Sequence, residues 1–249
     1  DGLRRREEGG RGHGEGCRVG PALGMPGAAR YSQARAKLAD CELHGVGSGA
    51  ELILVEGDSA QDSALAVRDA RTQAVLPLQG KPLNAWVATR GKVEQHVLFQ
   101  QLAQALGLPS ATTLPHDGMA ALRHERIVLL FDPDADGIHI GALVQLYFAR
   151  WLPAIVEAGL LCLCRAPMYE LVDADGVVHH ALTPDHRQRI EQSLCATADA
   201  PPPMVRALRG IGGFSPETLR RLCVDPSTRL ARTLTPHDVQ DAVDLFGGV

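Results

Sequence analysis

Three aspartates, Asp132, Asp134 and Asp136, alternate in the stretch LLFDPDADGIHI, directly after an apolar run. Their carboxylates repel one another unless a cation lies between them. Aspartates also cap helices and make turns without any metal, and Asp173 and Asp175 are interpreted in that way, as the tip of a hairpin. Three alternating carboxylates at the end of a strand instead favour a site for a divalent cation.

Magnesium is the cation that fits these residues best. It prefers hard oxygen ligands and keeps several waters, so one or two carboxylates per ion are enough. A further acidic residue, Glu56, ends the apolar run LILV. If both runs are strands of one parallel sheet, their carboxyl ends lie at the edge where such sheets bind ligands. Asp132 would then bridge two ions, with Glu56 and Asp134 on either side, as in phosphoryl transfer.

Two other ion or phosphate motifs are excluded. A calcium-binding EF-hand loop also begins D-x-D-x-D-G, but its twelfth position requires Glu, and the twelfth residue from Asp132 is Leu143. The stretch VLPLQGKP has Val75 and Pro82 where a phosphate loop requires Gly and Ser or Thr. No nucleotide-binding pocket is therefore expected in this chain.

Composition limits the class of protein. The chain has 249 residues, of which 45% are hydrophobic, enough for one large domain or a domain with an appendage. The net charge of −4 is unlike that of most nucleic-acid binders, although phosphate binding depends only on the charge of the groove in which the backbone lies. No apolar run approaches the length of a membrane span, so we expect a soluble, cytoplasmic protein without a membrane partner.

The six cysteines are scattered and form no C-x-x-C pair. Cys162 and Cys164 would point to one face of a strand, with nothing obvious to complete a metal set. We therefore expect reduced thiols in a reducing compartment, and not a structural zinc site.

Strands and helices are expected to alternate along the chain. The expected strands are residues 52–55, 72–80 (broken by Pro77 and Gly80) and 126–131, followed by a strand, turn and strand over 160–182. The expected helices run from an N-cap at Asp58 or Ser59 to about 68, over 91–108 and 138–159, and near 216–223 and 236–246, the last two capped by Ser215 and Thr235. Alternation and apolar strands predict an α/β fold with a parallel sheet covered on both faces.

Five stretches stand in one order: KLADCE, LILVEGDSA, AVLPLQGKPLNA, LLFDPDADGIHI and RGIGGFSPETL. Together they resemble the Toprim region and C-terminal tail of the B subunits of bacterial type IIA DNA topoisomerases, gyrase and topoisomerase IV. The resemblance implies a Toprim-like parallel sheet flanked by helices, with a smaller, mostly helical C-terminal tail. The expected domains are a flexible Gly/Arg-rich tail or linker over 1–34, a Toprim domain over 35–172, and a hairpin and helical tail region over 173–249.

The resemblance also implies roles for the acidic residues. Glu56 matches the catalytic glutamate of the family, a ligand of one Mg²⁺ and an acid/base. Asp132, the other catalytic residue, would bridge this ion and a second one. Asp134 would bind the second ion, and Asp136 would support both. Paired cations beside an in-line displacement act as an electrostatic clamp.

Three further residues are expected to bind DNA by the same resemblance. Lys81 and Asn84 match family positions that contact DNA, and Arg209 replaces a lysine of the tail motif. The partners implied are double-stranded DNA and an A-type subunit whose tyrosine attacks the phosphodiester, in a hetero-oligomeric complex. An ATP-hydrolysing domain is expected outside this chain, so ATP would act only through that domain and the chain would not be active alone.

Several basic positions of the family have lost their charge here. Leu65 stands in place of a lysine, Gln79 replaces a basic residue, and Gly141 replaces an arginine. Each lost phosphate contact weakens DNA binding. Two alternatives therefore stay open. One is a non-catalytic module that binds DNA or a partner protein, and the other is a stand-alone nuclease that uses water as nucleophile.

Overall fold

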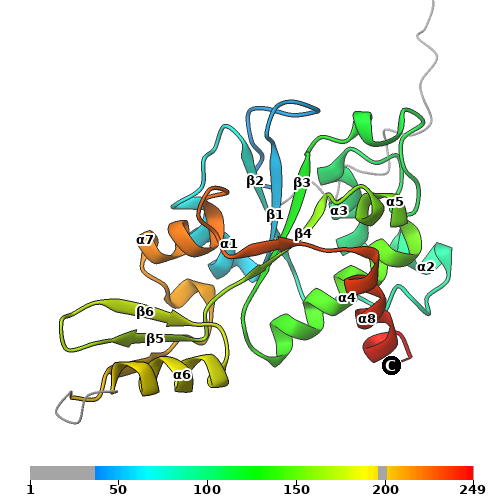
Figure 1. Ribbon diagram of the computed structural model, residues 1–249. Helices are drawn as coiled ribbons and strands as arrows, with labels where there is room; N and C mark the ends of the chain where they lie inside the picture. Colours follow the sequence, from blue (N-terminus) through cyan, green and yellow to red (C-terminus); the bar gives the residue numbers. More distant parts are fainter. Residues whose placement is uncertain (1–36, 196–200, 249) are drawn as a thin grey trace, which may run out of the picture.

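The computed structural model describes residues 37–195 and 201–248 (Figure 1). The expected flexible segment 1–34 lies outside the described residues. Within the described part of the chain, no helix is both long and apolar enough to cross a membrane.

A five-stranded sheet forms the centre of the molecule, in the order β2-β1-β3-β4-β8. The strands are β1 (Glu51–Glu56), β2 (Gln73–Leu78), β3 (Arg126–Phe131), β4 (Leu161–Arg165) and β8 (Ala231–Thr233). The first four are parallel, and β8 joins the edge antiparallel to β4. Interior strands of parallel sheets are covered on both faces, which explains their continuous apolar runs. The expected α/β fold is therefore confirmed.

Two layers of helices cover the sheet (Figure 1). They are α1 (Gly57–Leu65), α2 (Arg90–Gln95), α3 (Val97–Leu106), η1 (Gly118–Ala121), α4 (Ala135–Trp151) and α5 (Pro153–Glu157). Leu52 and Leu54 of β1 pack in one core cluster with α3, α4 and α5. Ile53 and Val55 point to the other face and pack with α1 and the C-terminal tail. Because successive side chains of a strand point to opposite faces of the sheet, the sheet divides the core into two halves.

Some expected element boundaries were wrong. The expected helix 91–108 is two helices, because His96 between them has extended backbone angles. The expected helix 138–159 breaks at Leu152, and Pro153, which has no N–H, begins α5. Pro77 lies inside β2, which is tolerated because β2 is an edge strand. The N-cap of α1 is Glu56, and not Asp58 or Ser59.

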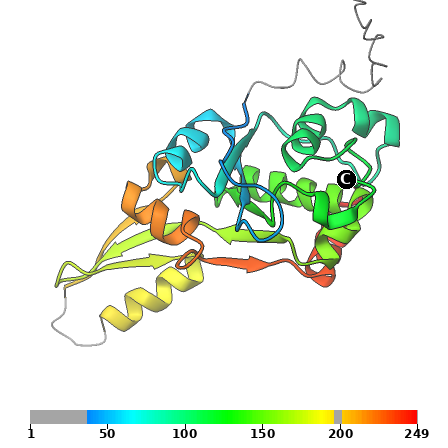
Figure 2. The same cartoon turned by 90° about the horizontal axis from the view of Figure 1, so that it is seen from above.

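A smaller antiparallel sheet, β6-β5-β7, extends to one side of the central sheet (Figure 2). It consists of β5 (Tyr169–Val172), β6 (Val178–Ala181) and β7 (Met204–Ala207), with α6 (Pro184–Leu194) beside it. Asp173 accepts hydrogen bonds from the backbone N–H groups of Asp175 and Val177 at the hairpin tip. The structural interpretation of these two aspartates is confirmed.

The C-terminal part returns to the central sheet. It contains η2 (Ile211–Gly213), α7 (Pro216–Leu219), a π-helix η3 (Arg220–Val224) and α8 (Pro236–Phe246). The expected caps are confirmed, since Ser215 accepts from the N–H of Thr218 and Thr235 forms a capping box with Asp238. The strand β8 completes the central sheet, and the domain boundary at 172/173 stays a prediction.

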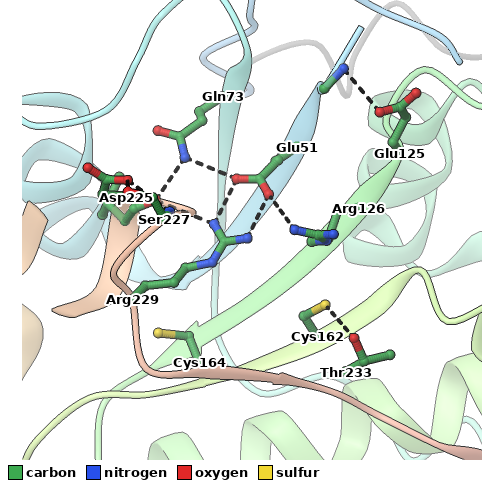
Figure 3. A network of polar contacts seen from close by, with 12 residues as sticks. Glu51, Gln73, Glu125, Arg126, Cys162, Cys164, Asp225, Ser227, Arg229 and Thr233 are labelled. Carbon is green, nitrogen blue, oxygen red and sulfur yellow. Dashed lines mark hydrogen bonds and ion pairs between the residues drawn. The ribbon is translucent and has the colours of Figure 1, made fainter. Parts of the chain in front are cut away.

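A buried ion pair joins this C-terminal part to the amino end of β1 (Figure 3). Arg229 donates to both carboxylate oxygens of Glu51, at 2.6 and 2.7 Å, and the two side chains are 3% and 6% exposed. Gln73 donates to the same carboxylate and to the carbonyl of Val224. Arg126 adds a longer contact of 3.4 Å from a half-exposed position. The C-terminal part is therefore attached by a bidentate, buried pair.

Candidate metal centre

Glu56 lies at the carboxyl end of β1, where the chain turns into α1. The turn requires a backbone φ of +73° at the next residue, a conformation that favours Gly57. Glu56 is the N-cap of α1, yet its side chain makes no capping hydrogen bond. Its carboxylate is therefore not used to stabilise the helix.

The aspartate cluster lies at the carboxyl end of the neighbouring strand β3, which pairs in parallel with β1. Asp134 caps α4, because its Oδ1 accepts from the backbone N–H of Gly137 at 2.9 Å. A Cβ at Gly137 would lie 2.1 Å from the carbonyl oxygen of Asp132, so this turn requires glycine. The helix cap and the glycine fix the path of the chain through the cluster, and Asp136 lies in the first turn of α4.

The carboxylate of Glu56 has too few positively charged neighbours to balance its burial and the nearby aspartates. Burial raises the pKa of Glu56, and repulsion from the three aspartates of the cluster raises it further, with Asp132 the largest of the three. Lys81 offsets part of this shift. The Oε2 atom of Glu56 is buried and has no hydrogen-bond partner among residues 37–195 and 201–248. A buried carboxylate oxygen without a partner, close enough to other carboxylates for them to raise its pKa, fits a site for a divalent cation. In the described residues, no three ligand atoms of Glu56, Asp132, Asp134 and Asp136 lie within 4.8 Å of one another, so the side chains would have to draw together around an ion.

Asp132 lies on the same edge and is half-buried. Burial raises the pKa of Asp132, and the charge of Asp134 adds to the increase. The backbone N–H of Ile211 acts in the opposite direction, because it donates to Oδ1 of Asp132 at 2.8 Å. The net direction is upward, so this carboxylate also lacks a compensating cation.

The C-terminal tail contributes directly to the cluster, which the sequence did not predict. A Cβ at Gly210 would lie 2.7 Å from Oδ2 of Asp132, and one at Gly212 would lie 3.2 Å from Oγ of Ser59. The glycines of the stretch RGIGGF therefore allow the backbone to approach the carboxylate and α1. The only signal in the sequence was the glycine spacing, which is also typical of an ordinary turn.

The structure pairs two of the expected site residues with each other. Lys81, expected to contact DNA, lies 2.5 Å from Oδ1 of Asp136, expected to support the metal ions. Both side chains are more than half exposed. The hydrogen bond from Lys81 is the main cause that lowers the pKa of Asp136. Asp136 therefore already has a cationic partner, unlike Glu56 and Asp132.

The other two expected DNA contacts lie in different surroundings. Arg209 is exposed and lines, with Pro133 and Asp134, a cavity of about 250 Å³ beside the acidic cluster. Asn84 is half-buried, donates to the carbonyl of Phe246 at 3.3 Å and accepts from the N–H of Trp86. In this structure Asn84 therefore holds the end of α8.

Two glutamines occupy positions near this edge without adding charge. Gln79 donates to Asp58 at 3.3 Å, and Asp58 is also ion-paired with Lys37 at 2.7 Å. Gln61 donates to the backbone carbonyls of Lys37 and Val75. These side chains attach the segment before β1 to the sheet.

The comparisons with known proteins agree with this geometry. The Toprim domain family matches residues 51–159, which include Glu56 and the aspartate cluster. The chain is 36% identical over 211 residues to the B subunit of DNA topoisomerase 4 from Pseudomonas aeruginosa, covering 84% of this chain and 32% of that protein.

Similar values are found for the B subunits of DNA topoisomerase 4 from two other bacteria. The protein of Escherichia coli is 34% identical over 205 residues, which cover 82% of this chain and 31% of that protein. The protein of Caulobacter vibrioides is 35% identical over 219 residues, which cover 88% and 30%. The chain thus spans about a third of the length of the curated relatives it matches.

Proposed function

Because the chain carries the Toprim region of a type IIA topoisomerase B subunit, we propose that it supplies the Mg²⁺-dependent half of a DNA cleavage and religation centre. The partner would be an A-type subunit that carries the tyrosine nucleophile. The observation that carries the proposal is the buried, unpartnered Oε2 of Glu56 beside the carboxylates of a neighbouring strand end, within the part of the chain that the structure describes.

Glu56, Asp132 and Asp134 would hold the metal, and Asp136 would support the site. Mg²⁺ bound there would stabilise the negative charge that develops on the phosphodiester and on the leaving 3′-oxygen. This donor set consists of hard carboxylate oxygens, as that ion requires. Asp132 would be positioned for the task by the N–H of Ile211, which holds one of its two oxygens.

Glu56 would also move a proton. Burial and neighbouring charges raise the pKa of Glu56, so its Oε2 holds a proton more readily than an ordinary glutamate does. Asp132, which is hydrogen-bonded to the tail, is held in place while Glu56 exchanges its proton. We assign acid/base catalysis to Glu56 from the family resemblance; its raised pKa describes the metal-free site, and a bound Mg²⁺ would lower it.

DNA would approach along the edge where Lys81 and Arg209 are exposed. Both side chains carry a charge that phosphate oxygens attract, and both lie near the acidic cluster. Asn84 would become a third DNA contact if the end of α8 moved away, because its side-chain amide now donates to the carbonyl of Phe246 in that helix. The ATP-driven cycle and a cytoplasmic location stay predictions for the whole protein.

The test is DNA cleavage by this chain together with the tyrosine-bearing A-type subunit of the same organism. Wild-type chain and Mg²⁺ should give covalent tyrosine–DNA product, whereas Glu56→Ala and Asp132→Ala should give none while keeping the far-ultraviolet circular dichroism spectrum. Asp175→Ala, at the hairpin tip, is the matched control and should cleave normally. Normal cleavage by both site variants would reject the proposal.

A non-catalytic binding module is the second candidate. The lost charges at Leu65, Gln79 and Gly141 favour it, and Gln79 donates to Asp58 where a basic side chain would bind phosphate. This candidate predicts DNA binding without any cleaved product in the same assay. Nicking of DNA by the chain alone would instead indicate a nuclease that uses water.

A further inference from the structure

A second cluster of potential metal ligands lies at the opposite end of the central sheet from Glu56 and Asp132. It consists of Asp40, Cys41, His44 and His124, and we call it the amino-edge cluster. One ligand atom from each of the four residues lies within 4.8 Å of each of the others. His124 lies two residues before the start of β3, and the other three lie in the segment before β1, at the top of Figure 1.

His124 is a buried residue of the amino-edge cluster whose ring nitrogens lack hydrogen-bond partners among the described residues. The residue is 1% exposed, and neither Nδ1 nor Nε2 has a hydrogen-bond partner in the part of the chain that the structure describes. Buried polar atoms are rarely left in this state, because each one loses its hydrogen bonds to water. Burial also lowers the pKa of His124 to about 4, so the ring is neutral at pH 7 and offers a lone pair.

His44 provides a second, independent observation. Its Nε2 lies 3.0 Å from Oδ1 of Asp40, which can only accept, and 2.7 Å from a guanidinium nitrogen of Arg123, which can only donate. A single ring nitrogen carries either a proton or a lone pair, so it can satisfy one of these neighbours and not both. Arg123 also donates to Oδ2 of Asp40, so one guanidinium now supplies the positive charge on which both side chains converge.

The surrounding loops hold the amino-edge cluster in place. The N–H of Gly45 donates to the carbonyl of Arg123 at 2.9 Å, which joins the two segments by their backbones. Glu125 accepts from the N–H groups of Gly47 and Gly49 and so fixes the loop that follows His44. The Sγ of Cys41 donates to the carbonyl of Leu43 at 3.1 Å. The donor atoms are therefore brought together by the fold itself.

We propose that Asp40, Cys41, His44 and His124 bind one Zn²⁺ ion. Zn²⁺ takes ligand atoms at about 2.0–2.3 Å in a tetrahedron, so two ligands of one ion lie roughly 3.3–3.8 Å apart. The four ligand atoms lie within 4.8 Å of one another, so the side chains need only a small adjustment to close around the ion.

The thiol of Cys41, whose pKa burial and Asp40 raise, would lose its hydrogen bond to the carbonyl of Leu43 and release its proton to solvent when the ion binds. The resulting thiolate, two imidazoles and one carboxylate form a borderline-soft set, which suits Zn²⁺ and not Mg²⁺ or Ca²⁺. On binding, Asp40 and His44 exchange the guanidinium of Arg123 for the ion.

The consequence is a cross-link between the segment before β1 and the start of β3. This cross-link lies at the amino ends of the strands, away from the carboxylates proposed to bind Mg²⁺, so it does not depend on the proposed function. Its expected role is to stabilise the fold. At a hundredfold excess of Zn²⁺ over its dissociation constant, the melting temperature should rise by roughly 5–10 °C.

The test uses the purified chain, freed of metal with a chelator and titrated with Co²⁺ and then Zn²⁺. We expect one equivalent of Co²⁺ to produce a thiolate-to-metal charge-transfer absorption band, which Zn²⁺ removes by displacement and excess Mg²⁺ leaves unchanged. Wild-type protein without this band would overturn the proposal, since Cys41 is one of the four ligands.

Variants assign the band to the amino-edge cluster. Cys41→Ser should abolish it, and His44→Ala should lower Zn²⁺ affinity at least about tenfold, since even residues that only orient a ligand contribute about 10–100-fold. The matched controls are Cys195→Ser and His116→Ala, at exposed positions outside the cluster, and both should bind as wild type. The His44 side chain is 31% exposed, and circular dichroism checks that this variant is folded. A band that survives Cys41→Ser, or equal affinity in His44→Ala and His116→Ala, would contradict the assignment.

Discussion

The backbone N–H of Ile211 donates to Oδ1 of Asp132 at 2.8 Å, although the two residues are 79 positions apart in the chain. One is in the C-terminal tail and the other at the end of a central strand. The tail therefore helps to set the orientation of the carboxylate proposed to bridge two metal ions. Several expected outcomes follow from this contact and from the charges around it.

Gly210→Ala should disturb the metal centre. Its Cβ would lie 2.7 Å from Oδ2 of Asp132, while the backbone of Gly210 is extended and accepts alanine without strain. We expect the Mg²⁺-induced rise in melting temperature to fall by half or more, because the carboxylate must turn away. Gly213→Ala, whose Cβ would meet nothing within 4 Å, is the control and should keep the full response. Equal responses in both variants would show that the tail does not position Asp132.

Glu56→Gln should stabilise the metal-free protein at pH 7. The pKa of Glu56 is raised in the folded state, so its charged form is less favourable there than in the unfolded chain. This contribution to stability is present at low pH and lost as pH rises above the unfolded value of about 4.5. In a protein of this size, each 1 kcal/mol of gain corresponds to a rise of about 2–4 °C in the melting temperature. Thermal melts in chelator at pH 7 and pH 4 measure it.

Two outcomes of these melts matter. The difference between Glu56→Gln and wild type should become smaller at pH 4, below the ordinary pKa of a glutamate, because less of the carboxyl group is charged. Added Mg²⁺ at pH 7 should reverse the order, since only the wild type keeps the carboxylate. A variant that is less stable than wild type in chelator at pH 7 would mean that Glu56 is already compensated.

Arg229→Ala should destabilise the fold strongly. It leaves the carboxylate of Glu51 buried without its bidentate partner, a loss of about 3–5 kcal/mol for comparable pairs. Arg126→Ala removes a contact of 3.4 Å from a half-exposed side chain and should cost about 1 kcal/mol or less. Urea denaturation of both variants measures the two losses, and similar values for the pair would show that the buried bridge contributes no more than the exposed one.

Lys81→Ala should weaken DNA binding in a salt-dependent manner. Each phosphate contact contributes about 0.9 to the slope of log affinity against log salt concentration. We expect this slope to fall by about that amount, whereas the Mg²⁺ response should persist or increase, because Asp136 and Glu56 lose a neighbouring positive charge. Lys92→Ala, on the exposed side of α2, is the matched control. Fluorescence anisotropy with duplex DNA at several salt concentrations measures both, and identical slopes for the two variants would exclude Lys81 from the interface.

The sequence was sufficient to predict those features that depend on residues close together in the chain. Apolar runs ending in Glu56 and Asp132 predicted two strand ends, and the parallel pairing of β1 with β3 puts these ends on one edge. Thr235 and Ser215 predicted helix caps, because a capping bond spans only three residues.

The remaining features depend on contacts between distant segments. Nothing in the local pattern indicated that Ile211 would reach Asp132, or that Arg229 would pair with Glu51. His124 and Cys41 looked unrelated, since neither belongs to a spaced ligand motif, yet the fold brings them together. Helix breaks at His96 and Leu152 were missed because the apolar spacing continues across both.

The most direct test of the central claim is Mg²⁺ binding, measured by calorimetric titration of the wild-type chain and of three variants. Saturable binding to the wild type and to Asp175→Asn, together with loss of binding in both Glu56→Gln and Asp132→Asn, is the result that a shared site on neighbouring strand ends predicts. Binding of equal strength in all four proteins, or no binding to the wild type, would contradict it.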